Sequence, residues 1–228
     1  MGHYLCIDTA ISGAFVGILE RVDSEVSEVA VKHFQPMFGS SSALPAMVHT
    51  LQCETNVEKF AGILLSTGPG SFTGIKVGIA FSKGYLAEVS GGAILPVNML
   101  AACGEQLAKE QNLSRLSLVL PATRTHGFAV DILEGKLTRC EVVERSDDDV
   151  LSAKSDSFVF ENPVMMTAWP KRDEFGSTLD TSELTSLMMR AMKATLPSNS
   201  DSSFVEISDI EPVYIREPAP VERKGERS

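Results

Sequence analysis

The 228-residue chain lacks a long apolar run, since no segment approaches the about 18 uninterrupted apolar residues that a membrane-spanning helix needs. Its first residues enter the short apolar stretch Tyr4–Ile7 directly, without the positively charged region and longer apolar core of a secretion signal. We therefore expect a soluble, cytoplasmic protein that does not associate with membranes.

The chain also lacks paired cysteines. Its four cysteines are widely spaced and form no C-x-x-C pair: Cys6, Cys53, Cys103 and Cys140. This spacing predicts neither a zinc knuckle nor a redox motif. Free, buried thiols in a reducing compartment are the expected state.

Positive charge is scarce as well. The chain has 20 Lys and Arg against 30 Asp and Glu, which gives a formal net charge of -10 and a pI near 4.9. Such an excess of carboxylates repels polyphosphate, whereas RNA-binding proteins usually present a basic face. If RNA belongs to the biology of this protein, we expect another subunit to hold it.

Histidine pairs at helical spacing are absent too. The four histidines lie far apart in the sequence, at His3, His33, His49 and His126. Two histidines three or four residues apart would lie on one face of a helix and could bind a metal ion. We therefore predict no metal site, although the sequence leaves open whether distant side chains converge in space. Ser71 has no adjacent histidine base and no G-x-S-x-G elbow occurs, so a serine nucleophile is not indicated.

What the chain does contain is an alternation of apolar runs and helical patterns. Three strands are predicted first, at Tyr4–Ile7, Ala14–Leu19 and Val29–Phe34. A helix follows from Ser41 or Ser42 to about Gln52, with Pro45 in its first turn. After it come a strand at Ile63–Ser66, a helix to about Val89, a strand at Ala93–Val97 and a helix at Met99–Lys109. This order is that of a ribonuclease-H-like lobe.

The same pattern starts again after Asn112. Strands are predicted at Leu116–Leu120, Gly127–Leu133, Leu137–Val143 and Phe158–Phe160, and a helix at Ser182–Thr195. We therefore predict a second, degenerate lobe that repeats the pattern but not the residues of the first. The expected domains are 1–112 and 113–217, followed by a charged, proline-marked tail at 218–228 that we expect to be mobile.

A glycine-rich segment joins the strand at Ile63–Ser66 to the next helix. It comprises Gly68, Pro69, Gly70, Ser71, Phe72, Thr73 and Gly74. Glycines at a strand-to-helix turn can cradle an anion with backbone N–H groups, or they can let a helix pack closely on a sheet. The segment matches neither the Walker pattern nor G-x-G-x-x-G, so both interpretations stay open.

The segment and its surroundings resemble the TsaB (YeaZ) family. Gly68 to Gly74 followed by Ile-Lys-Val-Gly is similar to that family's signature G-P-G-S-F-T-G-[LIV]-R-[IV]-G, with Lys76 in place of the usual arginine. Ile7–Ala10 resembles its opening I-D-T-A, Leu44-Pro45 its L-P, and Glu211–Arg216 its closing P-x-Y-x-R. The similarity is ordered and spans nearly the whole chain.

The resemblance implies an α/β fold of two ribonuclease-H-like lobes of the actin, sugar-kinase and Hsp70 (ASKHA) type. It implies a non-catalytic scaffold role in forming threonylcarbamoyladenosine on tRNA, with a TsaD-like transferase subunit, a TsaE-like ATPase and a second copy of the chain as partners. tRNA would be contacted only indirectly. No cofactor would be bound by this chain alone, while ATP could bind at the partner complex.

The resemblance also places the pairing surface on the helices before and after the glycine-rich segment. The candidate interface residues are Leu44, Met47, Val48, Leu51, Ile75, Ile79 and Phe81. In the second of these helices apolar residues cover more than half of the circumference, with Lys76 and Lys83 marking a narrow polar strip. One apolar face covers the sheet of the lobe, and we expect the remainder to join an intermolecular helix bundle.

The chain departs from the family pattern at two places, and two enzyme functions remain as alternatives. Gly39 stands where a histidine is common, and the usual D-A-R-x-x-E-V-Y of the second lobe is replaced by Pro121–Phe128. A metal-dependent, glycoprotease-like peptidase would need the absent histidine pair. An ASKHA-type phosphotransferase could place Asp8 and Thr9 near phosphate or metal, but it would need a second phosphate loop that the chain lacks. The alternative is that Asp8 organises its own turn through hydrogen bonds from its side chain to the backbone.

Overall fold

The structure is a computed structural model, which describes residues 1–11, 13–34, 40–88, 93–123, 125–144, 157–160, 177–197 and 204–210. The predictions that concern Gly39, Val89, Glu211–Arg216 and the tail 218–228 lie outside the described residues. Within them, no helix has the length and apolar character required to cross a bilayer.

The first lobe is a five-stranded sheet with the order β3-β2-β1-β4-β5. Its strands are β1 (Gly2–Asp8), β2 (Ala14–Val22), β3 (Glu25–Phe34), β4 (Gly62–Gly68) and β5 (Ala93–Asn98). β1 pairs antiparallel with β2 and parallel with β4, which makes it a central strand. Its side chains alternate between the two faces of the sheet, and both faces are covered, so a nearly continuous apolar run is required here.

The second lobe repeats this topology, with the order β8-β7-β6-β9-β10. Its strands are β6 (Arg115–Pro121), β7 (His126–Leu133), β8 (Lys136–Glu144), β9 (Ser157–Phe160) and β10 (Ser177–Leu179). β6 takes the place of β1, since it pairs antiparallel with β7 and parallel with β9. The repeated pattern predicted from the sequence is therefore present, and β10 is the strand that the prediction missed.

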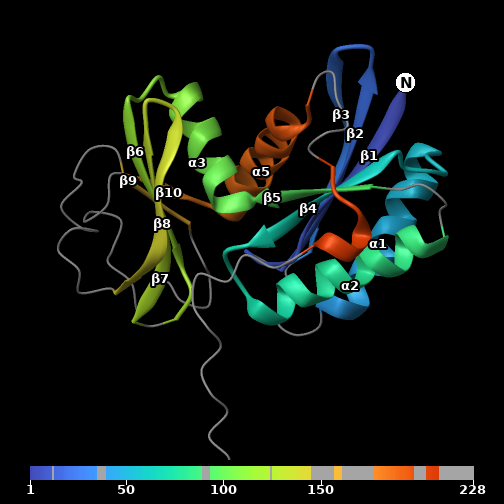
Figure 1. The fold of residues 1–228 in the computed structure, drawn as a ribbon, viewed down its shortest axis with the longest axis horizontal. Helices are drawn as coiled ribbons and strands as arrows, with labels where there is room; N and C mark the ends of the chain where they lie inside the picture. The colour runs from blue at the N-terminus through green and yellow to red at the C-terminus, as the bar shows by residue number, and fades with distance from the viewer. Residues whose placement is uncertain are drawn as a thin grey trace, which may run out of the picture.

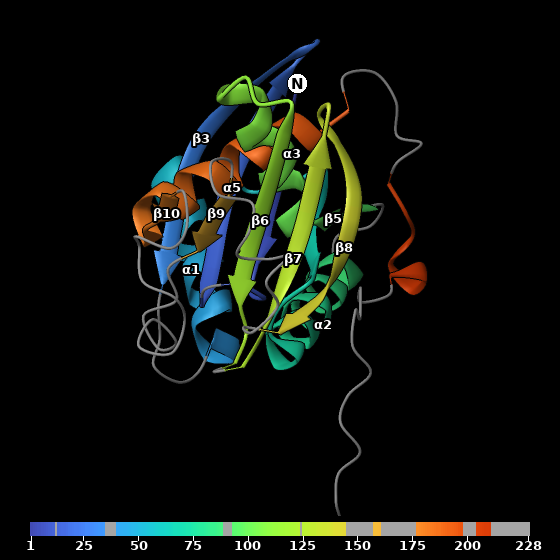
Figure 2. The same cartoon turned by 90° about the vertical axis from the view of Figure 1, so that its left-hand side faces the viewer.

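Helices lie in two layers (Figure 1). α1 (Ser40–Thr55) and α2 (Phe72–Glu88) cover the outer face of the first sheet. α3 (Met99–Glu110) and α5 (Thr181–Thr195) lie between the two sheets, and Figure 2 shows them behind the second sheet. Arg190 of α5 donates to both carboxylate oxygens of Glu110 on α3, at 2.6 and 3.1 Å, which ties the two inner helices together.

The buried side chains form two clusters on either side of the first sheet. The outer cluster joins Leu5 and Ile7 of β1 to α1 and α2. The inner cluster starts from Tyr4 and Cys6 on the opposite face of β1, runs through α3 and α5, and continues into β6 and β7. The two sheets therefore share one apolar core through the helices between them.

The cysteines are free, as expected, but not all are buried. Cys6 and Cys103 are fully buried, and burial raises the pKa of both thiols. Cys140 is half-buried and Cys53 is exposed on α1. The expectation of buried thiols is therefore wrong for Cys53, because the polar side of α1 faces solvent.

Candidate functional site

The glycine-rich segment packs directly on the end of β1. Gly70, Gly74 and Gly78 are spaced four residues apart and pack against Thr9 and Ala10, the residues that follow β1. A Cβ atom added to Gly70 would lie 2.4 Å from the carbonyl oxygen of Ala10, and one added to Gly74 would lie 1.8 Å from that of Thr9. At Gly78 it would lie 2.7 Å from the Thr9 hydroxyl oxygen. Close packing is thus the role of these glycines, and Gly78, the last residue of the family signature, belongs to the set.

Hydrogen bonds reinforce this contact. The Ser71 N–H donates to the carbonyl oxygen of Ala10 at 2.7 Å, and the Thr9 hydroxyl donates to the carbonyl oxygen of Gly74 at 2.7 Å. The Gly74 N–H donates to the Ser71 hydroxyl at 3.2 Å. The N–H group of Ser71, just before α2, and that of Gly74, in its first turn, are thereby bonded within the chain, so neither of these two groups is available to an anion.

Asp8 organises the turn after β1. It is 1% exposed, and its Oδ1 accepts hydrogen bonds from the backbone N–H groups of Ala10 at 3.1 Å and Ile11 at 3.0 Å. Burial raises the pKa of Asp8, opposed by the nearby Ser66 hydroxyl and by the two N–H donors. Neither the Oδ2 of Asp8 nor the Ser66 hydroxyl makes a full hydrogen bond within the part of the chain that the structure describes. The hydrogen bonds of Asp8 therefore show that it organises its own turn, which is one of the two roles considered for it.

A small cleft of about 280 Å³ lies where the glycine-rich segment meets the second lobe. Its walls are mostly apolar: Ala10, Ile11, Gly70, Ser71, Phe72, Leu120, Pro121, Ala122 and Phe128. Asp8 and Thr9 do not line it. The cleft is slightly smaller than the roughly 300–1,000 Å³ of typical small-molecule pockets.

The altered second-lobe segment contributes Pro121, Ala122 and Phe128 to this cleft, while its Thr123 stabilises a local turn. The Thr123 hydroxyl accepts hydrogen bonds from the N–H groups of Thr125 at 3.2 Å and His126 at 2.9 Å. Thr123 therefore serves its own turn, as Asp8 does in the first lobe.

The predicted interface residues separate into two groups. Leu44, Val48, Leu51 and Ile75 are at most 2% exposed and belong to the outer cluster of the chain itself. Their assignment to a partner surface is corrected here: the apolar stripe of α1 and the first turn of α2 cover the sheet of their own lobe. Met47, Ile79 and Phe81 are half-buried and keep some exposed surface.

Residues 40–158, just over half of the chain, match the model of the TsaD family, described as tRNA N6-adenosine threonylcarbamoyltransferase. The chain belongs to this family. Its role lies in tRNA modification, and the resemblance to TsaB (YeaZ) carried by the glycine-rich segment is confirmed.

Solved structures agree in fold. A Pseudomonas aeruginosa protein described as uncharacterised and similar to the peptidase YeaZ is 22% identical, with 95% of this chain and 100% of its own covered and a TM-score of 0.64. YeaZ from Pseudomonas aeruginosa is 20% identical, with 94% of this chain and 100% of its own covered and a TM-score of 0.63. No curated protein matches the chain. The fold is α/β and of the ASKHA type, as predicted.

The outer side of α2 in this TsaD-family chain is a strip of small and polar residues, which we call the α2 strip: Lys76, Ala80, Gly84 and Ala87, all exposed. A Cβ atom added to Gly84 would meet no described atom within 4 Å. The ammonium group of Lys76 lies 4.0 Å from the ring centre of Phe72, which is 40% exposed. The two polar positions predicted on α2 thus differ, since Lys76 is exposed and Lys83 is half-buried.

Half-buried apolar side chains flank the α2 strip. On the side toward α1, the rings of Phe81 and Tyr85 stack at 5.9 Å, and Gln52 donates to the Tyr85 hydroxyl at 3.2 Å. Ile79 lies on the other flank. At 100° per residue it is 200° around the helix from Val77, which lies on the same side as Phe81. The strip is therefore a narrow surface of small residues between two apolar borders.

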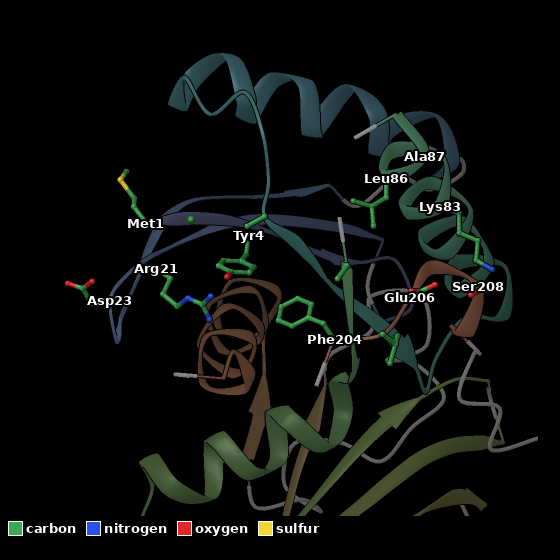
Figure 3. A pocket seen from close by; sticks show the side chains of 14 residues that line it. Met1, Tyr4, Arg21, Asp23, Lys83, Leu86, Ala87, Phe204, Glu206 and Ser208 are labelled. Atoms are coloured by element: carbon green, nitrogen blue, oxygen red, sulfur yellow. The ribbon is translucent and has the colours of Figure 1, made fainter. Parts of the chain in front are cut away.

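A larger hollow of about 990 Å³ lies at the opposite ends of β1 and β4 (Figure 3). Its walls anchor the segment 204–210. The Arg21 guanidinium lies 4.9 Å from the ring centre of Tyr4 and donates to the carbonyl oxygen of Pro197 at 3.0 Å. The rings of Tyr4 and Phe204 lie 5.9 Å apart, and Val205 exchanges two backbone hydrogen bonds with Ile94 of β5.

Metal binding is the other activity that the sequence leaves open. The structure places no three or more His, Cys, Asp or Glu side chains together for a metal ion in the ranges it describes. His3 and His126 each lie beside a glutamate, Glu20 at 3.3 Å and Glu144 at 3.5 Å. The absence of a resident metal stays a prediction.

Proposed function

We propose that this chain is a non-catalytic scaffold subunit for the threonylcarbamoyl modification of tRNA adenosine, and that it binds and supports a TsaD-like transferase. The observation that carries the proposal is the packing of the glycine-rich segment onto the end of β1. The glycine-rich segment, which could otherwise cradle a phosphate, is packed against the backbone of Thr9 and Ala10.

Phosphoryl transfer depends on positioning and on charge stabilisation, so it needs backbone donors, cations or metal-binding carboxylates directed at the phosphates. Here the donors of Ser71 and Gly74 are used inside the chain. The Asp8 carboxylate is buried and its Oδ1 serves its own turn. The adjoining cleft is small and mostly apolar. These features support a structural rather than a catalytic role.

The α2 strip supports partner binding. Small residues at Ala80, Gly84 and Ala87 would let the backbone of a second helix approach closely. Apolar atoms of Phe81 and Ile79 on its two borders would be covered at the same time. We place the contact with the TsaD-like subunit on this strip, with Met47 at its edge. A second copy of the chain would compete for the same surface.

The acidic balance of the chain supports an indirect role with tRNA. With a net charge of -10, long-range repulsion opposes the binding of a phosphate backbone. The transferase and a TsaE-like ATPase would then hold tRNA and nucleotide. The isolated chain should bind tRNA only weakly at physiological salt, and tight binding would contradict this part of the proposal.

The partner surface can be tested with charge substitutions. Ala80→Glu places a carboxylate on the α2 strip without touching the core, and Ala194→Glu places one on the exposed side of α5 as a matched control. We expect Ala80→Glu to weaken binding to a TsaD-like transferase at least about tenfold, as for a hot-spot position, with an unchanged circular dichroism spectrum. Modified adenosine formed by the reconstituted system should fall in parallel, while Ala194→Glu behaves as wild type.

The proposal fails if Ala80→Glu, Ile79→Glu and Phe81→Glu all fold and bind the transferase normally. The non-catalytic part has a separate test. Purified chain should neither hydrolyse ATP nor cleave peptides above background, and turnover that disappears in Asp8→Ala would show that the chain is an enzyme.

A further inference from the structure

The hollow shown in Figure 3 lies at the end of the first sheet away from the glycine-rich segment. It is bordered by the beginnings of β1, β4 and β5, by the last turns of α2 and by the segment 204–210. Its volume of about 990 Å³ is at the upper end of the roughly 300–1,000 Å³ of typical small-molecule pockets. Asp8 and the glycine-rich segment do not line it, and it shares only Ala87 with the α2 strip.

Two half-buried cations that have no carboxylate partner line this hollow. The other half-buried Lys and Arg side chains in the described ranges each pair with a carboxylate: Lys32 with Glu54, Arg139 with Asp131 and Glu141, and Arg190 with Glu110. Arg21 and Lys83 make no such pair within the part of the chain that the structure describes. Cations are scarce in this chain of net charge -10, so two unmatched ones in a single hollow favour an anionic ligand.

Arg21 is held in place but its charge is not neutralised. Its guanidinium lies 4.9 Å from the ring centre of Tyr4, and its Nη1 donates to the carbonyl oxygen of Pro197 at 3.0 Å. An aromatic ring and a carbonyl oxygen orient a guanidinium without cancelling its charge. The N–H groups that remain can bind a ligand, and the planar fork of a guanidinium matches the two oxygens of a carboxylate.

Lys83 adds a second positive charge, and aromatic rings lie between the two cations. In the view of Figure 3, Tyr4 and Phe204 lie between Arg21 and Lys83. The Phe204 ring packs closely on β4, since a Cβ atom added to Gly62 would lie 2.8 Å from its Cε1. The half-buried Phe204 therefore presents a fixed apolar surface inside the hollow.

The two carboxylates that line the hollow oppose an anion only weakly. Asp23 and Glu206 are both exposed, whereas Arg21 and Lys83 are half-buried. Water screens the exposed charges, while charges that are partly withdrawn from water interact more strongly with a ligand. The balance at the hollow therefore favours a negatively charged group.

We propose that this hollow is a binding site for a small organic carboxylate with a planar apolar body. Arg21 binds the carboxylate through its free N–H groups, and the body of the ligand packs on Phe204 between the two cations. The ammonium of Lys83 attracts the ligand from the other side of the rings. This site adds a small-molecule ligand to the scaffold role and is independent of it.

The test titrates the full chain with 2-naphthoate and, as a neutral control, with 2-naphthamide, which has the same ring and nearly the same shape. Calorimetry should show one 2-naphthoate bound per chain, and the amide should bind at least about tenfold more weakly. Arg21→Gln and Lys83→Gln should each weaken 2-naphthoate binding at least about fivefold. Lys136→Gln changes the net charge equally at an exposed position of β8, and should bind as wild type.

The melting temperature of each variant without ligand shows whether it is folded. Because Arg21 also bonds to Pro197, Lys83→Gln decides the matter if Arg21→Gln does not fold. The proposal is overturned by a lack of saturable 2-naphthoate binding, by equal affinity for the acid and the amide, by wild-type binding in folded Lys83→Gln, or by an equal loss in Lys136→Gln. The Ala80→Glu experiment tests the scaffold function separately, on the exposed side of α2.

Discussion

The packing of α2 on the end of β1 can be tested by making the same Gly→Ala substitution at two positions of this helix. Gly74→Ala adds a methyl group whose carbon would lie 1.8 Å from the carbonyl oxygen of Thr9. Gly84→Ala adds the same group on the same helix, with no described atom within 4 Å. Any difference between the variants therefore reports the close approach and not the chemistry of alanine.

The magnitudes follow from the geometry. Alanine gains up to about 1 kcal/mol over glycine within a helix, and this gain should appear in full at Gly84. At Gly74 the contact falls more than 1 Å short of a normal one, so α2 must move away from Thr9. Overpacking of this kind costs about 1–3 kcal/mol, and weakening the Thr9–Gly74 hydrogen bond costs about 1 kcal/mol more. We expect a net loss of about 2–3 kcal/mol for Gly74→Ala.

Thermal and urea unfolding followed by circular dichroism would measure both variants. For a domain of this size, about 1 kcal/mol corresponds to roughly 2–4 °C in Tm. Gly74→Ala should lower Tm by roughly 5–10 °C, and Gly84→Ala should raise it by roughly 2–4 °C. Equal effects of the same sign would show that α2 does not approach β1 as closely as described, and the argument that the glycine-rich segment serves packing would lose its basis.

Other substitutions test individual polar groups. Asp8→Asn keeps an acceptor for the turn and removes a carboxylate whose pKa is raised by burial, so it should stabilise the protein at pH 7; because ionisation of Asp8 opposes folding as the pH rises, this gain should shrink as the pH falls toward the ordinary value of 3.8. Ser82→Ala removes a buried hydroxyl that has no partner among the described residues, and should raise the free energy of unfolding by about 1 kcal/mol in urea titrations. The pKa of Glu110 is lowered by Arg190, so Glu110→Gln should cost less than about 1 kcal/mol at neutral pH; the difference should shrink as the pH falls from the ordinary value of 4.5 and vanish below the lowered pKa of the folded protein. Unfolding curves against pH that show no such convergence would contradict the first and third predictions.

Much of the fold can be predicted from local patterns. Short apolar runs such as Leu116–Leu120 are bounded by turn residues, and each of them is a strand in the structure. β10 (Ser177–Leu179) could not be predicted in this way, since three residues are too few to show an alternation. Periodicity thus identifies elements that are long enough to carry it.

The candidate site was harder to predict, because a pattern does not show what covers an apolar face. Leu44 and Ile75 have the periodicity expected of an interface helix, but only the tertiary packing places them in the chain's own core. Gly70 and Gly74 fit a phosphate loop equally well until the backbone of Thr9 is seen beside them. In both cases the deciding contact comes from residues distant in the sequence.

The layer formed by α3 and α5 bears on how the chain can be divided. A cut near residue 112 would follow the boundary between the two topological repeats, yet it would strip the inner face of the first sheet of α5, whose Met189 is buried against Gly17 of β2. Either fragment would expose apolar surface and should aggregate or stay unfolded when expressed alone. The whole protein should instead unfold in a single cooperative transition. The two repeats are separate in topology, but their stabilities are coupled through the shared helices. This coupling leaves little freedom for the lobes to rotate about a hinge.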